Sequence, residues 1–113
     1  MKKTTMALAL MIGSSACVQH HAVDPSGVAV ERALGAGYME TYTLRGVGWS
    51  CSGSVRASQY ERVSVRSVPL ACTDGATGTA QITYASSNRA MQVNTTVLVS
   101  YRLSDGRSGE VRV

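Results

Sequence analysis

Apolar and polar residues alternate along residues 91–103, and this alternation restricts the fold more than any other feature. The odd positions carry Met91, Val93, Thr95, Val97, Val99, Tyr101 and Leu103. The even positions carry mostly polar residues. A period of two puts one set on the core face of a β-strand and the other on its solvent face. We therefore predict an all-β domain over residues 38–113, a small antiparallel meander of five to seven strands that forms a sandwich or an open barrel.

The inward-facing parity changes at two points within this domain. It passes from even to odd positions early on: Tyr42 and Leu44, then Val47, Trp49 and Cys51. It passes from odd to even positions later: Val63 and Val65, then Val68, Leu70 and Cys72. We predict a β-bulge or a bend at residues 45–46 for the first change. Because Pro69 has no N–H to donate to a ladder, we predict an edge strand or a bulge at the second.

Two cysteines of the predicted domain point toward the core. Cys51 shares its parity with Trp49, and Cys72 shares its parity with Leu70. This arrangement predicts a disulfide between Cys51 and Cys72 beside a buried tryptophan. Closing a loop of this length should stabilise the fold by about 3 kcal/mol. A domain this small has a limited core, so that contribution is a large share of its stability.

A short pattern occurs twice, at residues 73–82 and 104–113. Each copy has a hydroxyl residue, Asp, Gly, any residue, a hydroxyl residue and Gly. We interpret both copies as hairpin turns, because Asp and Gly favour chain reversal. Parity favours odd-length loops, and a five-residue loop would pair Leu103 with Val111 and Leu70 with Ile82. One Asp per loop is too few for a calcium site.

The first 16 residues have the features of a secretory signal peptide. Lys2 and Lys3 precede an apolar run at residues 6–12, which small residues follow. The run is too short to span a bilayer as a helix. Residues 14–17, Ser-Ser-Ala-Cys, resemble a bacterial lipoprotein box, although Ser14 departs from the apolar residue usual there.

The resemblance implies that Cys17 is lipidated and becomes the N-terminus of a membrane-anchored protein. It also implies that Val18, in the place where Asp marks inner-membrane retention, directs the protein to the outer membrane. Lipidation accounts for the odd cysteine among three. The alternative is a soluble periplasmic protein in which Cys17 is a free thiol.

Residues 17–37 are expected to be a lipidated tether and linker. Residues 18–27 contain turn-forming and polar residues, and residues 28–34 are compatible with an extended segment or one loose turn. His20 and His21 are adjacent, but a metal site would need further ligands that the neighbouring sequence does not supply. We therefore predict no metal site and no cofactor.

Charge and side-chain chemistry argue against several classes of function. After removal of residues 1–16 the chain has nine arginines against seven acidic residues, a net charge of +2, and the arginines are scattered. A nucleic-acid interface would need them clustered. The predicted domain has no His or Lys to act as a base, and its carboxylates lie mostly next to turns or at outward positions. We predict no catalytic residues, no enzymatic activity and no small-molecule substrate.

The Trp49-x-Cys51 and Cys72-x-Asp74-Gly75 pattern is similar to one found in small bacterial lipoproteins of uncharacterised function. We expect a non-enzymatic envelope lipoprotein with a structural or accessory role, facing the periplasm, with an envelope protein as possible partner. One alternative is a periplasmic binding module or inhibitor. In general build the chain resembles the small lysozyme inhibitors, which are lipid-anchored β-barrels, but it lacks their Ser-Gly-x-x-Tyr stretch and basic loop. Another alternative is a component of a secretion or conjugation assembly.

Overall fold

The computed structural model describes residues 18–56, 64–85 and 95–113. The predicted signal peptide (residues 1–16) and the predicted lipidation site Cys17 lie outside these residues. Val63, which we expected to face inward, and residues 91–94 of the predicted strand also lie outside them. Among the described residues, no helix is long and apolar enough to cross a membrane.

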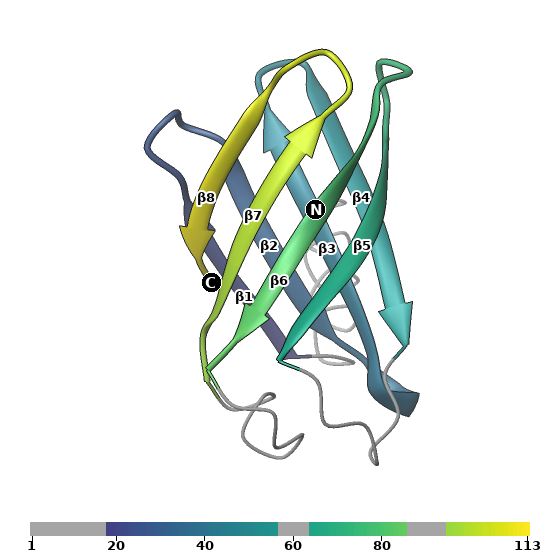
Figure 1. Ribbon diagram of the computed structural model, residues 1–113, viewed down its shortest axis with the longest axis vertical. Helices are drawn as coiled ribbons and strands as arrows, with labels where there is room; N and C mark the ends of the chain where they lie inside the picture. Colours follow the sequence, from purple (N-terminus) through teal and green to yellow (C-terminus); the bar gives the residue numbers. More distant parts are fainter. Residues whose placement is uncertain (1–17, 57–63, 86–94) are drawn as a thin grey trace, which may run out of the picture.

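The described residues form one sheet of eight antiparallel strands, in which each strand pairs with its neighbours in the sequence. The strands are β1 (Val18–Val23), β2 (Ala29–Leu34), β3 (Met39–Gly46), β4 (Trp49–Arg56), β5 (Val65–Cys72), β6 (Thr77–Tyr84), β7 (Val97–Leu103) and β8 (Ser108–Arg112). A single 3-10 turn, η1 (Ala36–Tyr38), precedes β3. The sheet curls into a nearly closed barrel (Figure 1). The predicted all-β meander is therefore confirmed.

The barrel begins earlier in the chain than predicted. Residues 18–27 were expected to be a tether, but Val18–Val23 forms β1. Residues 28–34 were expected to be extended or one loose turn, and they are extended, since Ala29–Leu34 forms β2. β2 pairs with β3 along its whole length, from Ala29 opposite Arg45 to Leu34 opposite Glu40. This corrects the linker assignment and raises the number of described strands to eight. The short polar β1 shows little periodicity of its own, so its ladder with β2 determines its conformation.

The first parity change comes from a hairpin turn at residues 47–48 and not from the predicted bulge or bend at residues 45–46. β3 and β4 pair in unbroken register up to Gly46 opposite Trp49, which leaves Val47 and Gly48 as a two-residue turn. Gly48 has a φ of +79°, a conformation that glycine adopts at low cost. Val47 at the tip is 99% exposed, so the prediction that it faces inward is wrong.

No parity change occurs in β5. Val68 and Leu70 face the core as predicted, but the same alternation places Arg66 inside and leaves Val65 exposed. Pro69 lies on an internal strand, so the edge-strand prediction is wrong. The ladder between β4 and β5 nevertheless has only two pairs among the described residues, ending at Ser52 opposite Ala71. Pro69 lies just beyond this point, where no donor is needed on that side.

Both repeated Asp-Gly segments form hairpin turns. The loops are three residues long, since Cys72 N donates to Ala76 O at 2.9 Å and Leu103 N donates to Arg107 O at 2.8 Å. Their odd length is confirmed, but the predicted five-residue loops and their pairings are wrong. The ladder instead pairs residue 70 with residue 78 and residue 101 with residue 109. A glycine with positive φ in each loop reverses the chain sooner than predicted.

The predicted disulfide is present. Cys51 and Cys72 lie directly opposite each other on β4 and β5, with Cα atoms 3.9 Å apart, and their sulfur atoms are bonded. Trp49 is half-buried and packs against the edge of the core. The fully buried apolar core consists mainly of inward side chains from β2 to β7: Val30, Tyr42, Leu44, Cys51, Val68, Leu70, Ala80, Ile82, Tyr84, Val97, Val99, Tyr101 and Leu103, with Val113 after β8.

Candidate functional site

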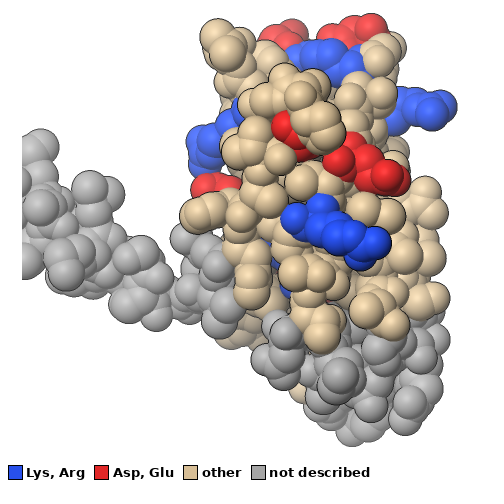
Figure 2. Space-filling view, turned by 90° about the vertical axis from the view of Figure 1, so that its left-hand side faces the viewer, with Lys and Arg blue, Asp and Glu red and all other residues tan. Residues whose placement is uncertain are grey.

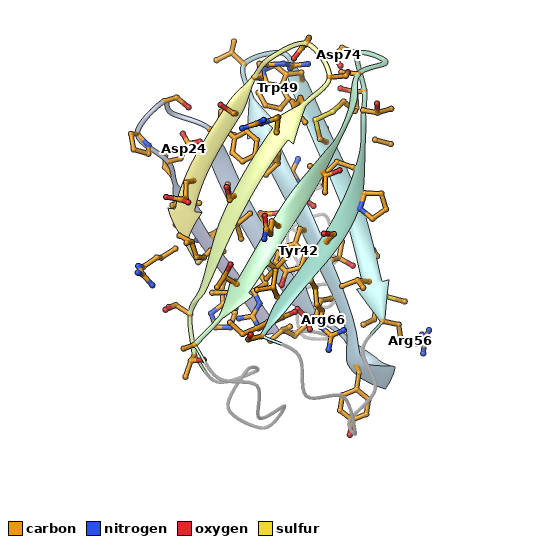
Figure 3. All side chains as sticks on the ribbon, in the orientation of Figure 1. Asp24, Tyr42, Trp49, Arg56, Arg66 and Asp74 are labelled. Atoms are coloured by element: carbon orange, nitrogen blue, oxygen red, sulfur yellow. A yellow bond between two sulfur atoms is a disulfide. The ribbon has the colours of Figure 1, made fainter. Side chains whose placement is uncertain are left out.

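Charged and phenolic side chains lie inside one half of the barrel. We call this group the interior polar cluster: Arg32, Glu40, Tyr42, Arg66 and Tyr84. Tyr42 and Arg66 lie in the lower half of the barrel in Figure 3, away from Trp49 and Asp74 at the upper end. The cluster therefore occupies the half of the interior that lies away from the disulfide.

A carboxylate holds this cluster together. Glu40 is fully buried, and its Oε1 accepts hydrogen bonds from Tyr42 OH at 2.6 Å and from Tyr84 OH at 2.7 Å. Arg32 is also fully buried, and its Nη1 donates to the carbonyl of Thr95 at 3.1 Å. The Arg66 guanidinium lies 5.8 Å from the centre of the Tyr84 ring, within the range of a cation–π contact.

The two tyrosines of the cluster remain protonated at neutral pH. Burial, together with the neighbouring Glu40 charge, raises the pKa of Tyr42 far above its ordinary value. Burial and the hydrogen bond to Glu40 raise the pKa of Tyr84 to about 12. Both hydroxyls are therefore hydrogen-bond donors committed to one buried carboxylate, an arrangement that fixes the interior of the barrel.

The barrel contains a histidine, which the sequence analysis had placed in the tether. His20 lies on β1 opposite Arg32, so it shares the inward face, and its Nε2 is buried without a hydrogen-bond partner among the described residues. His21 is exposed on the outer face. No group of three His, Cys, Asp or Glu residues that could hold a metal ion occurs in the described part of the chain.

A second buried carboxylate lies where the barrel closes. We call the junction between β1 and β8 the seam, and no backbone hydrogen bond joins these two strands among the described residues. Asp24, in the turn between β1 and β2, accepts a 2.6 Å hydrogen bond from Tyr101 OH on β7. The strand between them, β8, has Gly109 at this level, where a Cβ atom would collide with both groups.

Hydrogen bonds keep Asp24 ionised despite its burial. Burial disfavours the charge, but Tyr101 OH, the Ser26 hydroxyl and the backbone N–H groups of Ser26 and Val28 all donate to the carboxylate. Together they outweigh the desolvation and hold the pKa below its ordinary value of 3.8. Burial and the hydrogen bond to Asp24 raise the pKa of Tyr101 to about 12.

Arg107 cross-links the loops at the end of the barrel near the disulfide. Its Nη2 lies 2.9 Å from Asp74 Oδ2 and 2.6 Å from Asp105 Oδ2, so it joins the two repeated turns. Its guanidinium also stacks on the Trp49 ring, 4.3 Å from the ring centre. The hydrogen bond and charge of Arg107 lower the pKa of Asp105. The contacts of Arg107 thus link the two Asp-Gly turns to each other and to Trp49 at this end of the barrel.

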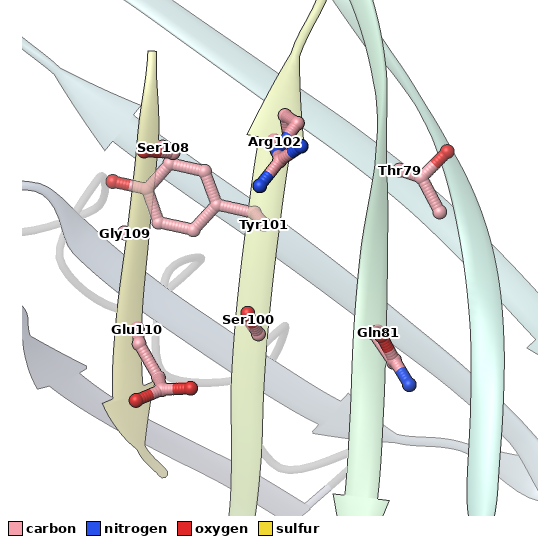
Figure 4. Close-up of a pocket in the computed structure, with 8 residues that line it drawn as sticks. All are labelled: Thr79, Gln81, Ser100, Tyr101, Arg102, Ser108, Gly109 and Glu110. Carbon is pink, nitrogen blue, oxygen red and sulfur yellow. The ribbon is translucent and has the colours of Figure 1, made fainter.

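A polar hollow lies on the outer wall of the barrel. We call it the outer groove; its volume is about 620 Å³, and it crosses β6, β7 and β8 above the backbone of Tyr101 and Gly109 (Figure 4). Its polar side chains are Thr79, Gln81, Ser100, Arg102, Ser108 and Glu110. The face in Figure 2 shows basic and acidic groups in small adjacent patches, with no broad area of one sign.

Comparisons with known proteins give no functional assignment. No family model matches the chain, and searches of curated proteins and of solved structures find no match.

The sequence predicted one cysteine pair but not the four buried charged residues, Asp24, Arg32, Glu40 and Arg66. The structure joins Cys51 to Cys72 as predicted. Glu40 shares its even parity with Tyr42 and Leu44, so the alternation itself indicated an inward carboxylate. Arg32 shares its even parity with Val30, which likewise indicated that its side chain points inward. Asp24 had no such signal, because its partner lies 77 positions away.

Proposed function

We propose that this protein is a non-enzymatic envelope lipoprotein whose barrel is a rigid accessory or binding module. The signal-peptide features and Cys17 support the anchor. The cross-strand disulfide supports an oxidising compartment, where such bonds form and persist. In this proposal Cys17 is lipidated and the anchored barrel faces the periplasm, with the outer membrane as the expected location.

The packed barrel interior is the observation that carries the binding role. Apolar side chains fill one half and the interior polar cluster occupies the other, with Glu40 committed to two tyrosines. Recognition of a partner would therefore use the outer surface. The loop end cross-linked by Arg107 and the disulfide keep that surface rigid, which lowers the entropic cost of binding.

An inhibitor of a periplasmic enzyme is the second candidate. The short chain and its barrel-like sheet support this function, since the lysozyme inhibitors are lipid-anchored β-barrels of similar length. The missing Ser-Gly-x-x-Tyr stretch and basic loop argue for a different target or a different contact surface. A role within a secretion or conjugation assembly requires the same anchored, rigid module.

The intact mass of the protein from a membrane fraction tests the anchor. We expect the mass of residues 17–113 plus acyl chains, and an increase of two hydrogens after reduction of the disulfide. The Cys17→Ser variant should move to the soluble periplasmic fraction. An unmodified mass with a free Cys17 thiol would refute the lipoprotein assignment.

A separate assay tests the binding role. Cross-linking in intact cells, followed by affinity purification and mass spectrometry, should identify a stoichiometric envelope partner. Activity assays of lysozymes with the purified protein test the inhibitor alternative. Measurable turnover of an envelope substrate by the protein itself would overturn the non-enzymatic assignment.

A further inference from the structure

The outer groove has a regular geometry that the strand register imposes. Thr79, Arg102 and Ser108 form one outward row across β6, β7 and β8, and Gln81, Ser100 and Glu110 form the next. The rows are two residues apart along each strand, which is about 7 Å. They extend over two strand spacings, which is about 10 Å. The six side chains therefore cover a patch of about 7 by 10 Å, which is large enough for about two small rings of an oligomer.

All six polar side chains of the groove are available to a ligand. None of them makes a side-chain hydrogen bond or an ion pair with any described residue. Comparable groups on the opposite wall are already paired: Thr41 Oγ1 with Ser54 Oγ at 2.9 Å, and Arg45 with Glu31 at 3.5 Å. The outer groove therefore contains side-chain hydrogen-bond donors and acceptors that are not paired with any described residue.

The charges in the groove select the chemistry of the ligand. The Arg102 guanidinium only donates hydrogen bonds and the Glu110 carboxylate only accepts them, and they lie on neighbouring strands, diagonal to each other. Their charges cancel, so neither an anion nor a cation is favoured. An amide group, which has one N–H donor and one C=O acceptor, complements this pair. The four neutral side chains complement hydroxyl groups.

The position and lining of the groove argue against an extended peptide that adds to the sheet. A peptide that adds to the sheet as a strand lies parallel to β8 and needs pockets for alternate side chains. The groove lies over the outer face of β6, β7 and β8 and not along an edge of the sheet, and its side chains are polar. A ligand that is hydroxylated along its length and carries amide groups fits better.

We infer that the outer groove binds an oligosaccharide of N-acetylated amino sugars. This inference deepens the proposed function and rests on it in one respect, because an envelope location would place the barrel beside glycan polymers. The groove is shallow and lacks an aromatic platform at its surface, so the sugar is held by hydrogen bonds. Binding is therefore weak for one chain and useful mainly for proteins held at a membrane, where local concentration is high.

The test uses the chain from residue 17 onward, with Cys17→Ser so that no acyl group is attached and with the Cys51–Cys72 disulfide intact. Amide chemical shifts are followed by NMR during titration with chitotetraose, with cellotetraose, and with a Ser-Lys-Ser-Glu peptide. We expect saturable shifts on β6, β7 and β8 with chitotetraose and weaker binding of cellotetraose, which has no amide groups.

Matched variants locate the site. Ser100→Tyr fills the groove and should weaken chitotetraose binding at least about tenfold, a factor equivalent to about 1.4 kcal/mol. Ser52→Tyr places the same side chain on the outer face of β4 and should leave binding unchanged. If Ser100→Tyr does not fold, Arg102→Gln and Glu110→Gln at exposed positions should reduce the preference for chitotetraose over cellotetraose.

Three results would overturn the inference: no saturable binding of either oligosaccharide, binding of the peptide alone, or shifts that map outside the groove and respond equally to Ser52→Tyr. None of these results depends on lipidation. If no oligosaccharide binds at the groove, the proposed lipidation of Cys17 is unaffected. If Cys17 is not lipidated, glycan binding can still be measured.

Discussion

The hydroxyl of Tyr101 on β7 donates a 2.6 Å hydrogen bond to the carboxylate of Asp24, 77 positions earlier in the chain. The bond passes β8 at Gly109, the position that leaves room for it. It ties the turn between β1 and β2 to the other end of the meander. Because no backbone hydrogen bond joins β1 to β8 among the described residues, this contact is a main element of barrel closure.

Removing this closing contact should destabilise the barrel. Tyr101→Phe loses a hydrogen bond to a charged group and should lower the free energy of unfolding by about 1.5–3 kcal/mol. Gly109→Ala places a methyl group against both partners and should also be destabilising. Ser108→Ala, an exposed neighbour, should change it by less than about 0.5 kcal/mol. Urea denaturation measures all three, and equal effects at residues 108 and 109 would contradict the role of Gly109.

The same contact predicts that the protein loses stability at acid pH. The pKa of Asp24 is lower in the folded state than its ordinary value of 3.8. Its contribution to stability is therefore present above that value and is lost as the pH falls through the folded-state pKa. In Asp24→Asn the loss of stability between neutral pH and acid pH should be smaller. Thermal unfolding followed by circular dichroism across this range makes the comparison, and parallel curves would exclude Asp24 as a contributor.

Two buried tyrosines predict that the protein also loses stability at alkaline pH. Folding raises the pKa of Tyr84 and of Tyr101 from 10.0 to about 12. Their stabilising contribution is complete below pH 10 and is lost as the pH rises toward 12. Tyrosinate absorbance should rise together with unfolding, and Tyr101→Phe should reduce the slope of stability in this interval. Ionisation of all tyrosines near pH 10 in the folded protein would contradict both buried environments.

Glu40 should be essential for the packing of the barrel interior. Glu40→Leu leaves the hydroxyls of Tyr42 and Tyr84 without their acceptor, at a cost of about 1–3 kcal/mol for each buried group. Glu40→Gln retains an acceptor oxygen and should cost less. Glu31→Gln on the outer face is the matched control, with an effect under about 0.5 kcal/mol. Chemical denaturation gives the ranking, and a neutral Glu40→Leu would mean that the network adds no stability.

The disulfide should supply a large part of the stability. It closes a loop of 21 positions, so replacing both Cys51 and Cys72 by alanine should lower the free energy of unfolding by about 3 kcal/mol. Cys17→Ser should leave it unchanged, since residue 17 precedes β1. The two variants are compared by urea denaturation at neutral pH. An equal effect of both would show that the cross-link itself is not what stabilises the barrel.

The sequence by itself determined the β class of the fold, its antiparallel meander, the Cys51–Cys72 pair and the positions of the Asp-Gly turns. These features depend on local chemistry: a period of two separates a wet face from a dry one, and glycine with positive φ reverses the chain. Parity also predicted correctly that residues such as Tyr42, Leu44 and Val99 face the core.

Only the tertiary structure decided which partners the buried polar residues have and how the barrel closes. β1 and β2 are strands because a neighbouring strand satisfies their backbone hydrogen bonds, a condition that their own residues do not reveal. The carboxyl groups of Glu40 and Asp24 can be buried because tyrosines from distant strands donate hydrogen bonds to them. Such stabilisation depends on contacts across 44 and 77 positions, which arise only when the sheet has curled into a barrel.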